Sequence, residues 1–352
     1  MRAIELVGVK ELEETILPDP APGPGQVVVR VESVGICGSD LSAYRGLHPR
    51  MVPPLVLGHE FAGEIVTTGP GVVGELVGSR VAVDPLVTCG VCDACAGGRR
   101  NICHRYRVIG GRPGLPGAFA ELVAVDADLT WALPDECSYV SGALVQPLAV
   151  SHHAVMNRAQ VVEGDAVLII GAGPIGLGAL LIALAQGATV TVTDIDAYRL
   201  AVAERLGAHQ TFLAGPTDLN KAGGPTRPRI VLECAGGRQS MTLATATAWC
   251  RPGGRIVIVG NFADGVDGID PVAMKANELE VLGSQAYVDS FGEVIEMVRS
   301  HRLDPIGIVS HVLGLDEAAA GLELLDDPNT EKTKIVMGAQ SYELPGASRS
   351  FP

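Results

Sequence analysis

The chain has 352 residues, of which 47% are hydrophobic and 19% are charged, and its formal net charge at pH 7 is −14. This length predicts two domains, and the apolar content excludes a chain that is disordered over most of its length. The negative charge disfavours nucleic acid and anionic membranes as partners, because their phosphates would be repelled.

Both ends of the chain carry a compositional signal. Residues 1–6 alternate charged and apolar side chains without the apolar core of a secretory signal, so a cytoplasmic location is expected. Pro, Gly and Ser collect in residues 341–352, where we expect disorder.

The first 130 residues or so contain short apolar strands separated by glycine and proline, which predicts a β-rich module with long loops. Cys37, His59 and a cluster of four cysteines fall in those loops. From residue 143 to 156 the pattern becomes helical. The clearest strands are expected at residues 27–31, 63–66, 80–83 and 121–125.

The stretch from Cys37 to Glu60 contains a thiol, a hydroxyl at Ser39, and an imidazole beside a carboxylate at His59-Glu60. Thiolate, imidazole and oxygen ligands together suit zinc better than magnesium or calcium. The same residues are equally compatible with a buried cysteine, a capped turn and a core histidine. Taken alone, this stretch leaves both interpretations open.

Four cysteines, Cys89, Cys92, Cys95 and Cys103, lie within one predicted loop. Four thiolates close a tetrahedral zinc site and leave no position for a substrate, so the spacing predicts a structural zinc. A disulfide pair is disfavoured in a chain without an export signal. An iron–sulfur cluster is disfavoured because the spacing differs from the common ferredoxin runs.

After residue 165 strands and helices alternate, which predicts parallel βαβ units. An apolar run at 167–170 has the composition of a strand buried on both faces. The uncharged run 166–185 is long enough for a membrane span, but a glycine turn interrupts it after the strand and excludes that interpretation. Residues 214–228 are rich in Gly and Pro, and we expect a loop there with at most one helical turn. Helices are expected at 197–206, 293–299 and from 316, and strands at 189–193, 229–232, 255–259, 307–311 and 334–337.

A Gly-x-Gly-x-x-Gly motif links the first of these strands to the helix that follows. Gly171 permits the tight turn, Gly173 lets the backbone approach a pyrophosphate, and Gly176 lets helix and strand pack closely. Pro174 and Ile175 complete the loop, where N–H groups at the start of the helix would face the phosphates. The motif therefore predicts a dinucleotide site.

Asp194 ends the next strand and is placed to accept hydrogen bonds from the adenosine ribose hydroxyls. A 2′-phosphate would meet this like charge, so NAD is favoured over NADP. Arg199, which would line the adenosine end, keeps NADP in consideration. Gly236 and Gly260, at the ends of two later strands, are expected to line the nicotinamide site or to act as plain turn residues.

Taken together, Cys37-Gly38-Ser39-Asp40, Gly58-His59-Glu60, the four cysteines and the glycine motif with Asp194 resemble the zinc-dependent medium-chain dehydrogenase/reductase family. The most similar branch contains sorbitol, butanediol and threonine dehydrogenases. The resemblance implies an α/β protein in which a GroES-like, β-rich catalytic domain accompanies a Rossmann domain with a doubly wound parallel sheet. It places the catalytic domain at residues 1–148 and 289–352, the NAD-binding domain at 149–288, and the active site between them.

The resemblance also implies a catalytic zinc bound by Cys37 and His59. Glu60 would be a direct ligand or one that moves in as substrate and water exchange. Gln146 stands where many polyol-oxidising relatives have glutamate. Its neutral amide is a weaker ligand than a carboxylate, and a hydrogen-bonding role beside the metal is the alternative.

In the implied mechanism Ser39 accepts the proton of the substrate hydroxyl, and Asp40 holds the second ring nitrogen of His59. Ser42 occupies the position at which many relatives have a histidine that ends the proton relay, so the exit of the proton is unassigned.

These inferences predict a zinc enzyme with two zinc ions per chain that transfers a hydride between NAD and a secondary alcohol, such as a polyol, vicinal diol or cyclitol. An aldose dehydrogenase acting at the anomeric carbon is the alternative that Gln146 motivates. A nucleotide-binding protein without turnover is the alternative of another class. A homo-oligomer, tetramer or dimer, is expected from the resemblance, and residues 41–54 and 110–119 are expected to shape the substrate site.

Overall fold

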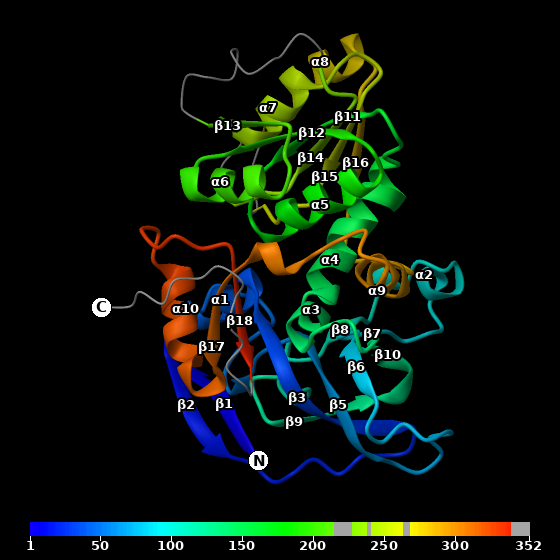
Figure 1. Cartoon of the computed structure of the whole chain (residues 1–352), viewed down its shortest axis with the longest axis vertical. Helices are drawn as coiled ribbons and strands as arrows, with labels where there is room; N and C mark the ends of the chain where they lie inside the picture. The colour runs from blue at the N-terminus through cyan, green and yellow to red at the C-terminus, as the bar shows by residue number, and fades with distance from the viewer. Residues whose placement is uncertain (215–226, 238–240, 263–267, 339–352) are drawn as a thin grey trace. The chain divides into compact units, whose positions relative to one another are not determined.

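The computed structural model describes residues 1–214, 227–237, 241–262 and 268–338 (Figure 1). The predicted loop at 214–228 lies mostly outside these residues, and the tail at 341–352 lies wholly outside them. The chain divides into two compact units. Unit 1 comprises Met1–Gln146, Phe291–Arg299 and Val309–Pro352, and unit 2 comprises Pro147–Ser290 and Ser300–Ile308.

The division differs from the predicted domain limits by two residues at 147–148 and at 289–290, and over a longer segment near the C-terminal part. Ser300–Ile308 falls inside the range 289–352 that the sequence assigned to the catalytic domain, yet it groups with unit 2. The reason is local packing, since the 3-10 turn η4 (Ile306–Ile308) contacts helix α5 (Pro174–Ala185), and Gly307 lies against the side chain of Leu206.

In the described part of unit 2, six strands form one parallel sheet in the order β13-β12-β11-β14-β15-β16. This order is that of a doubly wound dinucleotide-binding fold, in which the direction of winding reverses between the first and fourth strands. Helices α5 and α6 lie on one face of the sheet, and α7 and α8 lie on the other (Figure 1). The strands are β11 (Ala166–Ile170), β12 (Thr189–Asp194), β13 (Gln210–Leu213), β14 (Ile230–Glu233), β15 (Arg255–Ile258) and β16 (Glu280–Gly283). The remaining helices are η3 (His153–Ala159), α6 (Ala197–Arg205), α7 (Met241–Trp249) and α8 (Pro271–Ala276).

Local sequence explains the ends of these elements. Gly173 is the N-cap of α5 and Pro174 is its first residue, where the missing proline N–H costs no helical hydrogen bond. Asp196 caps α6, because its carboxylate accepts the N–H groups of Tyr198 and Arg199.

In the described part of unit 1, the main sheet has seven strands in the order β10-β6-β5-β3-β18-β17, with β9 also paired to β3. β17 and β18 run parallel, and the remaining pairs of this sheet are antiparallel. The strands are β3 (Gln26–Ile36), β5 (Glu60–Thr68), β6 (Arg80–Val83), β9 (Leu122–Asp126), β10 (Thr130–Ala132), β17 (Val309–Gly314) and β18 (Lys334–Gly338). Smaller sheets contain β1 (Arg2–Gly8), β2 (Glu11–Ile16) and β4 (Leu55–Val56), and β7 (Leu86–Val87) with β8 (Arg107–Val108).

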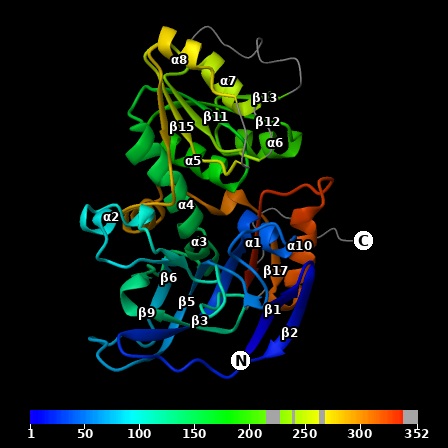
Figure 2. The ribbon, with the colours of Figure 1, turned by 180° about the vertical axis from the view of Figure 1, so that it is seen from behind.

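The helices of unit 1 are short. α10 packs beside α1 and β17 (Figure 2). The apolar core around the main sheet includes Phe61 and Phe119, which are almost fully buried. The helices and turns are α1 (Gly38–Tyr44), α2 (Asp93–Ala96), η1 (Arg100–Ile102), η2 (Ala127–Leu129), α3 (Tyr139–Ala143), α9 (Phe291–Arg299), η5 (Leu315–Glu317) and α10 (Ala318–Asp326).

The helical pattern expected around residues 143–156 is confirmed, and the structure divides it among several elements. The chain forms α3, then α4 (Val145–His152), and then the π-helical turn η3. Pro147 explains the break, because a proline has no N–H to donate to the preceding turn and is tolerated only where a helix begins. The helix predicted from Asp316 likewise starts as the 3-10 turn η5 before α10.

Within the residues described, no helix combines the length and the apolar run that a membrane crossing requires.

The first prediction concerns the ion pair between Arg229 and Asp165, whose guanidinium and carboxylate meet through two hydrogen bonds in unit 2. Arg229 lowers the pKa of Asp165, so the pair stabilises the fold above about pH 4 and this contribution is lost as the pH falls through the depressed value. We expect Arg229→Met to lower the free energy of unfolding by about 1–3 kcal/mol at pH 7, and by less at pH 3. Urea unfolding at both pH values measures this.

Arg299→Met is the control, because its pair with Glu296 is exposed and is expected to contribute little. Equal losses in the two variants would contradict the assignment.

Candidate active site and metal centres

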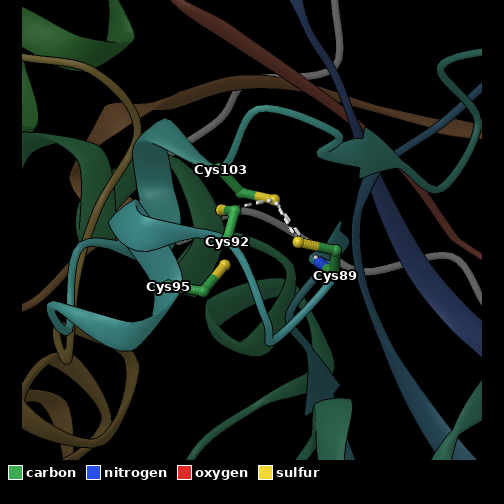
Figure 3. A group of neighbouring side chains, drawn as sticks. All are labelled: Cys89, Cys92, Cys95 and Cys103. Atoms are coloured by element: carbon green, nitrogen blue, oxygen red, sulfur yellow. Dashed lines mark hydrogen bonds between the residues drawn. The ribbon is translucent and has the colours of Figure 1, made fainter.

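The four cysteine side chains converge on one point in the lobe that contains α2 and η1 (Figure 3). Cys103 Sγ lies 3.4 Å from Cys89 Sγ and 3.9 Å from Cys92 Sγ. In a tetrahedral zinc site with Zn–S bonds near 2.3 Å, the sulfur atoms lie about 3.8 Å apart. The ligand atoms of all four residues lie within 4.8 Å of one another, so the lobe fits a closed zinc site.

Backbone amides prepare this lobe for a metal. The N–H groups of Val91 and Cys92 lower the pKa of Cys89 to about 6. Burial raises the pKa of Cys95 to about 11. Because cysteines bind a metal as thiolates, zinc binding at this lobe would release protons.

A second group of candidate ligands comes together where strand β3 ends and its partner strand β5 begins. Cys37 directly follows β3, His59 directly precedes β5, and Glu60 is the first residue of β5. Gly35 pairs with Glu60 across these antiparallel strands, so the register brings the three side chains to one place. Their ligand atoms lie within 4.8 Å of one another. Thiolate, imidazole and carboxylate form a donor set that fits zinc.

Asp40 connects the two residues that the sequence proposed as ligands. It is fully buried, its Oδ2 accepts the backbone N–H of Cys37 at 2.8 Å, and its Oδ1 lies 3.5 Å from Nδ1 of His59. Burial alone would lower the pKa of His59, but the charges of Asp40 and Cys37 outweigh it and raise that pKa well above its usual range. With Nδ1 facing Asp40, Nε2 is the nitrogen available to a metal, and Ser39 Oγ lies 3.4 Å from it.

Glu60 has a partner that sequence reasoning missed. Lys334, the first residue of β18, donates from Nζ to the Glu60 carboxylate and to the carbonyl oxygen of Ile36. Each of the two charged side chains is only 2% exposed. A lysine at the start of an apolar strand resembles a solvent-facing charge, so the sequence contained no signal for this contact.

The structure also places Gln146 and the segment 41–54, which the sequence assigned to the zinc shell and to the substrate site. Gln146 lies half-buried in the first turn of α4, and its role as a ligand stays a prediction. His48 Nδ1 accepts the backbone N–H groups of Arg50 and Met51. Arg50 also donates to the hydroxyl of Tyr106 at 2.6 Å, which ties the segment 41–54 to the cysteine lobe.

Each glycine of the motif in unit 2 has the surroundings that its predicted role requires. Gly171 has φ +100° and its α-carbon lies against Ala235, where a Cβ would come 2.8 Å from the backbone nitrogen. At Gly176 a Cβ would overlap the carbonyl oxygen of Gly171. A Cβ at Gly173 would meet no atom within 4 Å. Open space at Gly173 is what the approach of a dinucleotide phosphate requires.

The neighbouring predicted residues surround this loop. Asp194 accepts the N–H of Ala172 at 2.6 Å and the N–H of Asp196 at 2.9 Å, so its carboxylate is fixed beside the motif. Arg199 Nε lies 3.4 Å from the Asp196 carboxylate. At the ends of β14 and β15, Gly236 and Gly260 are in close contact, since a Cβ on Gly260 would meet the nitrogen of Gly236. Pro174 and Ile175 are half-exposed at the start of α5.

Comparison with known proteins agrees with both units. The family model described as "Alcohol dehydrogenase GroES-like domain" matches residues 23–135, and the one described as "Zinc-binding dehydrogenase" matches residues 174–300. Sorbitol dehydrogenase of Bacillus subtilis is 34% identical over 345 residues, which cover 96% of this chain and 97% of that protein. The chain belongs to the zinc-type medium-chain alcohol dehydrogenase family.

Solved structures of other family members have the same fold. An alcohol dehydrogenase of Escherichia coli CFT073 in complex with NADH has a TM-score of 0.89 at 30% identity, covering 96% of this chain and 99% of that one. A zinc-binding dehydrogenase of Sinorhizobium meliloti bound to NADP has a TM-score of 0.88 at 32% identity, covering 96% and 98%. The predicted fold class, a GroES-like domain with a Rossmann domain, is confirmed, and this family member is an oxidoreductase.

The second prediction concerns Gly173. We expect Gly173→Val to fold normally, because its φ of −71° suits any residue, and to weaken NADH binding at least about tenfold by filling the open space. Fluorescence titration with NADH measures the affinity, and circular dichroism checks the fold. Gly176→Val is the contrast, since it should prevent unit 2 from folding. Unchanged NADH affinity in Gly173→Val would place the phosphates elsewhere.

The third prediction concerns the cysteine lobe. We expect Cys95→Ser to lower the zinc content from two ions per chain to one and to lower the Tm by on the order of 10 °C. Metal analysis by mass spectrometry and thermal unfolding measure the two effects. Cys137→Ser, which changes a buried free cysteine of the same unit, should keep both ions. A zinc content that is equal in both variants would refute the site.

Proposed function

We propose that this protein is an NAD-dependent zinc dehydrogenase that oxidises a secondary alcohol of a polyol, vicinal diol or cyclitol. The observation that carries the proposal is the group of Cys37, His59 and Glu60, with Ser39 beside the metal-facing nitrogen of His59. The similarity to a sorbitol dehydrogenase supports the substrate class.

In this proposal Cys37 and His59 hold the catalytic zinc, with Gln146 and Glu60 as the candidates for completing its shell. When bound, zinc would supply a Lewis acid that lowers the pKa of the substrate hydroxyl. Ser39 would accept the hydroxyl proton, and Asp40 would keep His59 oriented through Nδ1. The structural ion would be bound by Cys89, Cys92, Cys95 and Cys103.

NAD is the proposed cofactor. The buried Asp194 carboxylate, fixed beside the glycine loop, would accept ribose hydroxyls and would repel a 2′-phosphate. The pyrophosphate would lie against the glycine loop, which consists of Gly171, Gly173, Pro174, Ile175 and Gly176. Arg199 would face the adenosine, and Gly236 and Gly260 would face the nicotinamide. Because one relative was solved with NADP bound, the activity should be measured with NAD and with NADP.

We further propose that unit 1 is the catalytic domain and unit 2 is the NAD-binding domain of a cytoplasmic homotetramer. Metal-binding thiols fit a reducing compartment. Light scattering after gel filtration distinguishes a tetramer from a dimer.

The fourth prediction is the activity itself. Purified protein supplied with NAD should form reduced nicotinamide with sorbitol, butanediol or inositol derivatives, and not with glucose-type aldoses. The absorbance of the reduced nicotinamide measures the reaction. Activity confined to aldoses would establish the alternative that Gln146 motivates, oxidation at the anomeric carbon.

Cys37→Ser tests whether the zinc group performs the reaction. We expect kcat/KM to fall at least about 1000-fold and one zinc ion per chain to be lost, while Cys137→Ser keeps both. Activity that is equal in Cys37→Ser and in the unchanged protein would refute the role of the group. Absence of any turnover together with retained NADH binding would favour a nucleotide-binding protein without catalysis.

A further inference from the structure

The two segments that the sequence assigned to the substrate site, residues 41–54 and 110–119, differ in charge from the rest of the chain. The protein contains 40 acidic and 26 basic residues, yet these segments contain Arg45, Arg50 and Arg112 and no aspartate or glutamate. Arg45 forms an ion pair with an acidic residue of α10. Arg50 and Arg112 are exposed, and neither has an acidic partner in the part of the chain that the structure describes.

The guanidinium group of Arg50 is held in place by Tyr106. It donates to the phenol oxygen at 2.6 Å, and its Cζ lies 4.9 Å from the centre of the ring. The backbone beside it is also fixed, because the buried Met51 donates its N–H to Nδ1 of His48 at 2.9 Å. A guanidinium carries several N–H donors in one planar fork, and the hydrogen bond to Tyr106 accounts for one of them. Arg50 is therefore a positioned cation that can donate further hydrogen bonds.

The segment that carries Arg50 lies beside the candidate catalytic group. The N–H of His48 donates to the carbonyl oxygen of Ser42 at 3.2 Å, which turns the segment back onto helix α1. Burial lowers the pKa of the His48 imidazole, and the charge of Arg50 lowers it further. The charges of Asp40 and His59 also shift this pKa, in opposite directions. Since a charge has a clear effect on a pKa only at short range, the imidazole lies near Arg50 as well as near the candidate site.

We propose that Arg50 is a specificity-determining residue that binds an anionic group, a carboxylate or a phosphate, at one end of the alcohol substrate. This inference rests on the proposed function, and it names the preferred substrates as polyols that carry a negative charge. A guanidinium can donate two parallel N–H groups to a carboxylate or a phosphate, which an uncharged hydroxyl cannot match. In a protein with a net charge of −14, a positive charge at this place also attracts anions that the remaining surface repels.

The fifth prediction compares sorbitol with gluconate, gulonate and sorbitol 6-phosphate, which carry a carboxylate or a phosphate at one end of the same carbon chain. We expect at least one of these anions to have a KM about tenfold below that of sorbitol, because a charge-assisted pair strengthens binding. Arg50→Gln should remove this preference. Arg50→Lys should keep part of it, since an ammonium group has the charge but not the fork. The rate of NAD reduction at varied alcohol concentration gives KM and kcat, and the preferred anion distinguishes carboxylate from phosphate.

Arg107→Gln is the matched control, because it removes the same charge from an exposed position on β8, outside both segments. It should keep the preference for the anion. Three results would overturn the inference: a preference that survives Arg50→Gln, an equal loss in Arg107→Gln, or no preference in the unchanged protein.

Tyr106→Phe tests the same contact without removing the arginine. It takes away the hydroxyl that accepts from Arg50, so we expect it to weaken the preference about threefold. An unchanged preference in Tyr106→Phe would contradict the positioning of Arg50 by this residue. If the unchanged protein oxidises none of these alcohols and none of those in the fourth prediction, the proposed function itself is refuted, so the two failures are distinguishable.

Discussion

The antiparallel pairing of β3 with β5 is the constraint on which the candidate site depends. Its register sets Gly35 opposite Glu60, which brings the end of one strand and the start of the other to the same level of the sheet. Cys37 and His59 are the residues just beyond those positions. A shift of one residue would turn every side chain of a strand to the opposite face. The apolar core that fixes this register therefore also fixes the position of the candidate metal ligands.

Charges around this register are arranged in pairs. Asp40 accepts the backbone N–H of Cys37 and faces His59, and Lys334 binds Glu60. In a buried environment an unpaired charge would be costly, so each partner limits the positions that its neighbour can adopt. The pairs therefore determine which donor atoms face a metal as well as stabilising the strands.

Sequence reasoning anticipated which residues come together where they lie close along the chain. The glycine motif with Asp194 and the four cysteines were recognisable because a strand, a turn and a helix, or one loop, bring them together. It failed where strands far apart in the chain meet, as Lys334 does with Glu60, because nothing near residue 334 indicates which strand lies beside it. The helical pattern around residues 143–156 was recognised, but it did not show that the chain is interrupted between α3 and α4, close to Pro147.

A count of charges shows what the choice between Gln146 and Glu60 as a ligand would change. Cys37 contributes one negative charge to the proposed site, whereas His59 and Gln146 are neutral as ligands. A divalent ion held by these three residues would retain a net positive charge and would supply Lewis acidity. A second anionic ligand would cancel that charge and would occupy the position that the alcohol needs. Glu60, which pairs with Lys334 in the same core, is the anion of this group whose ligation would make that difference.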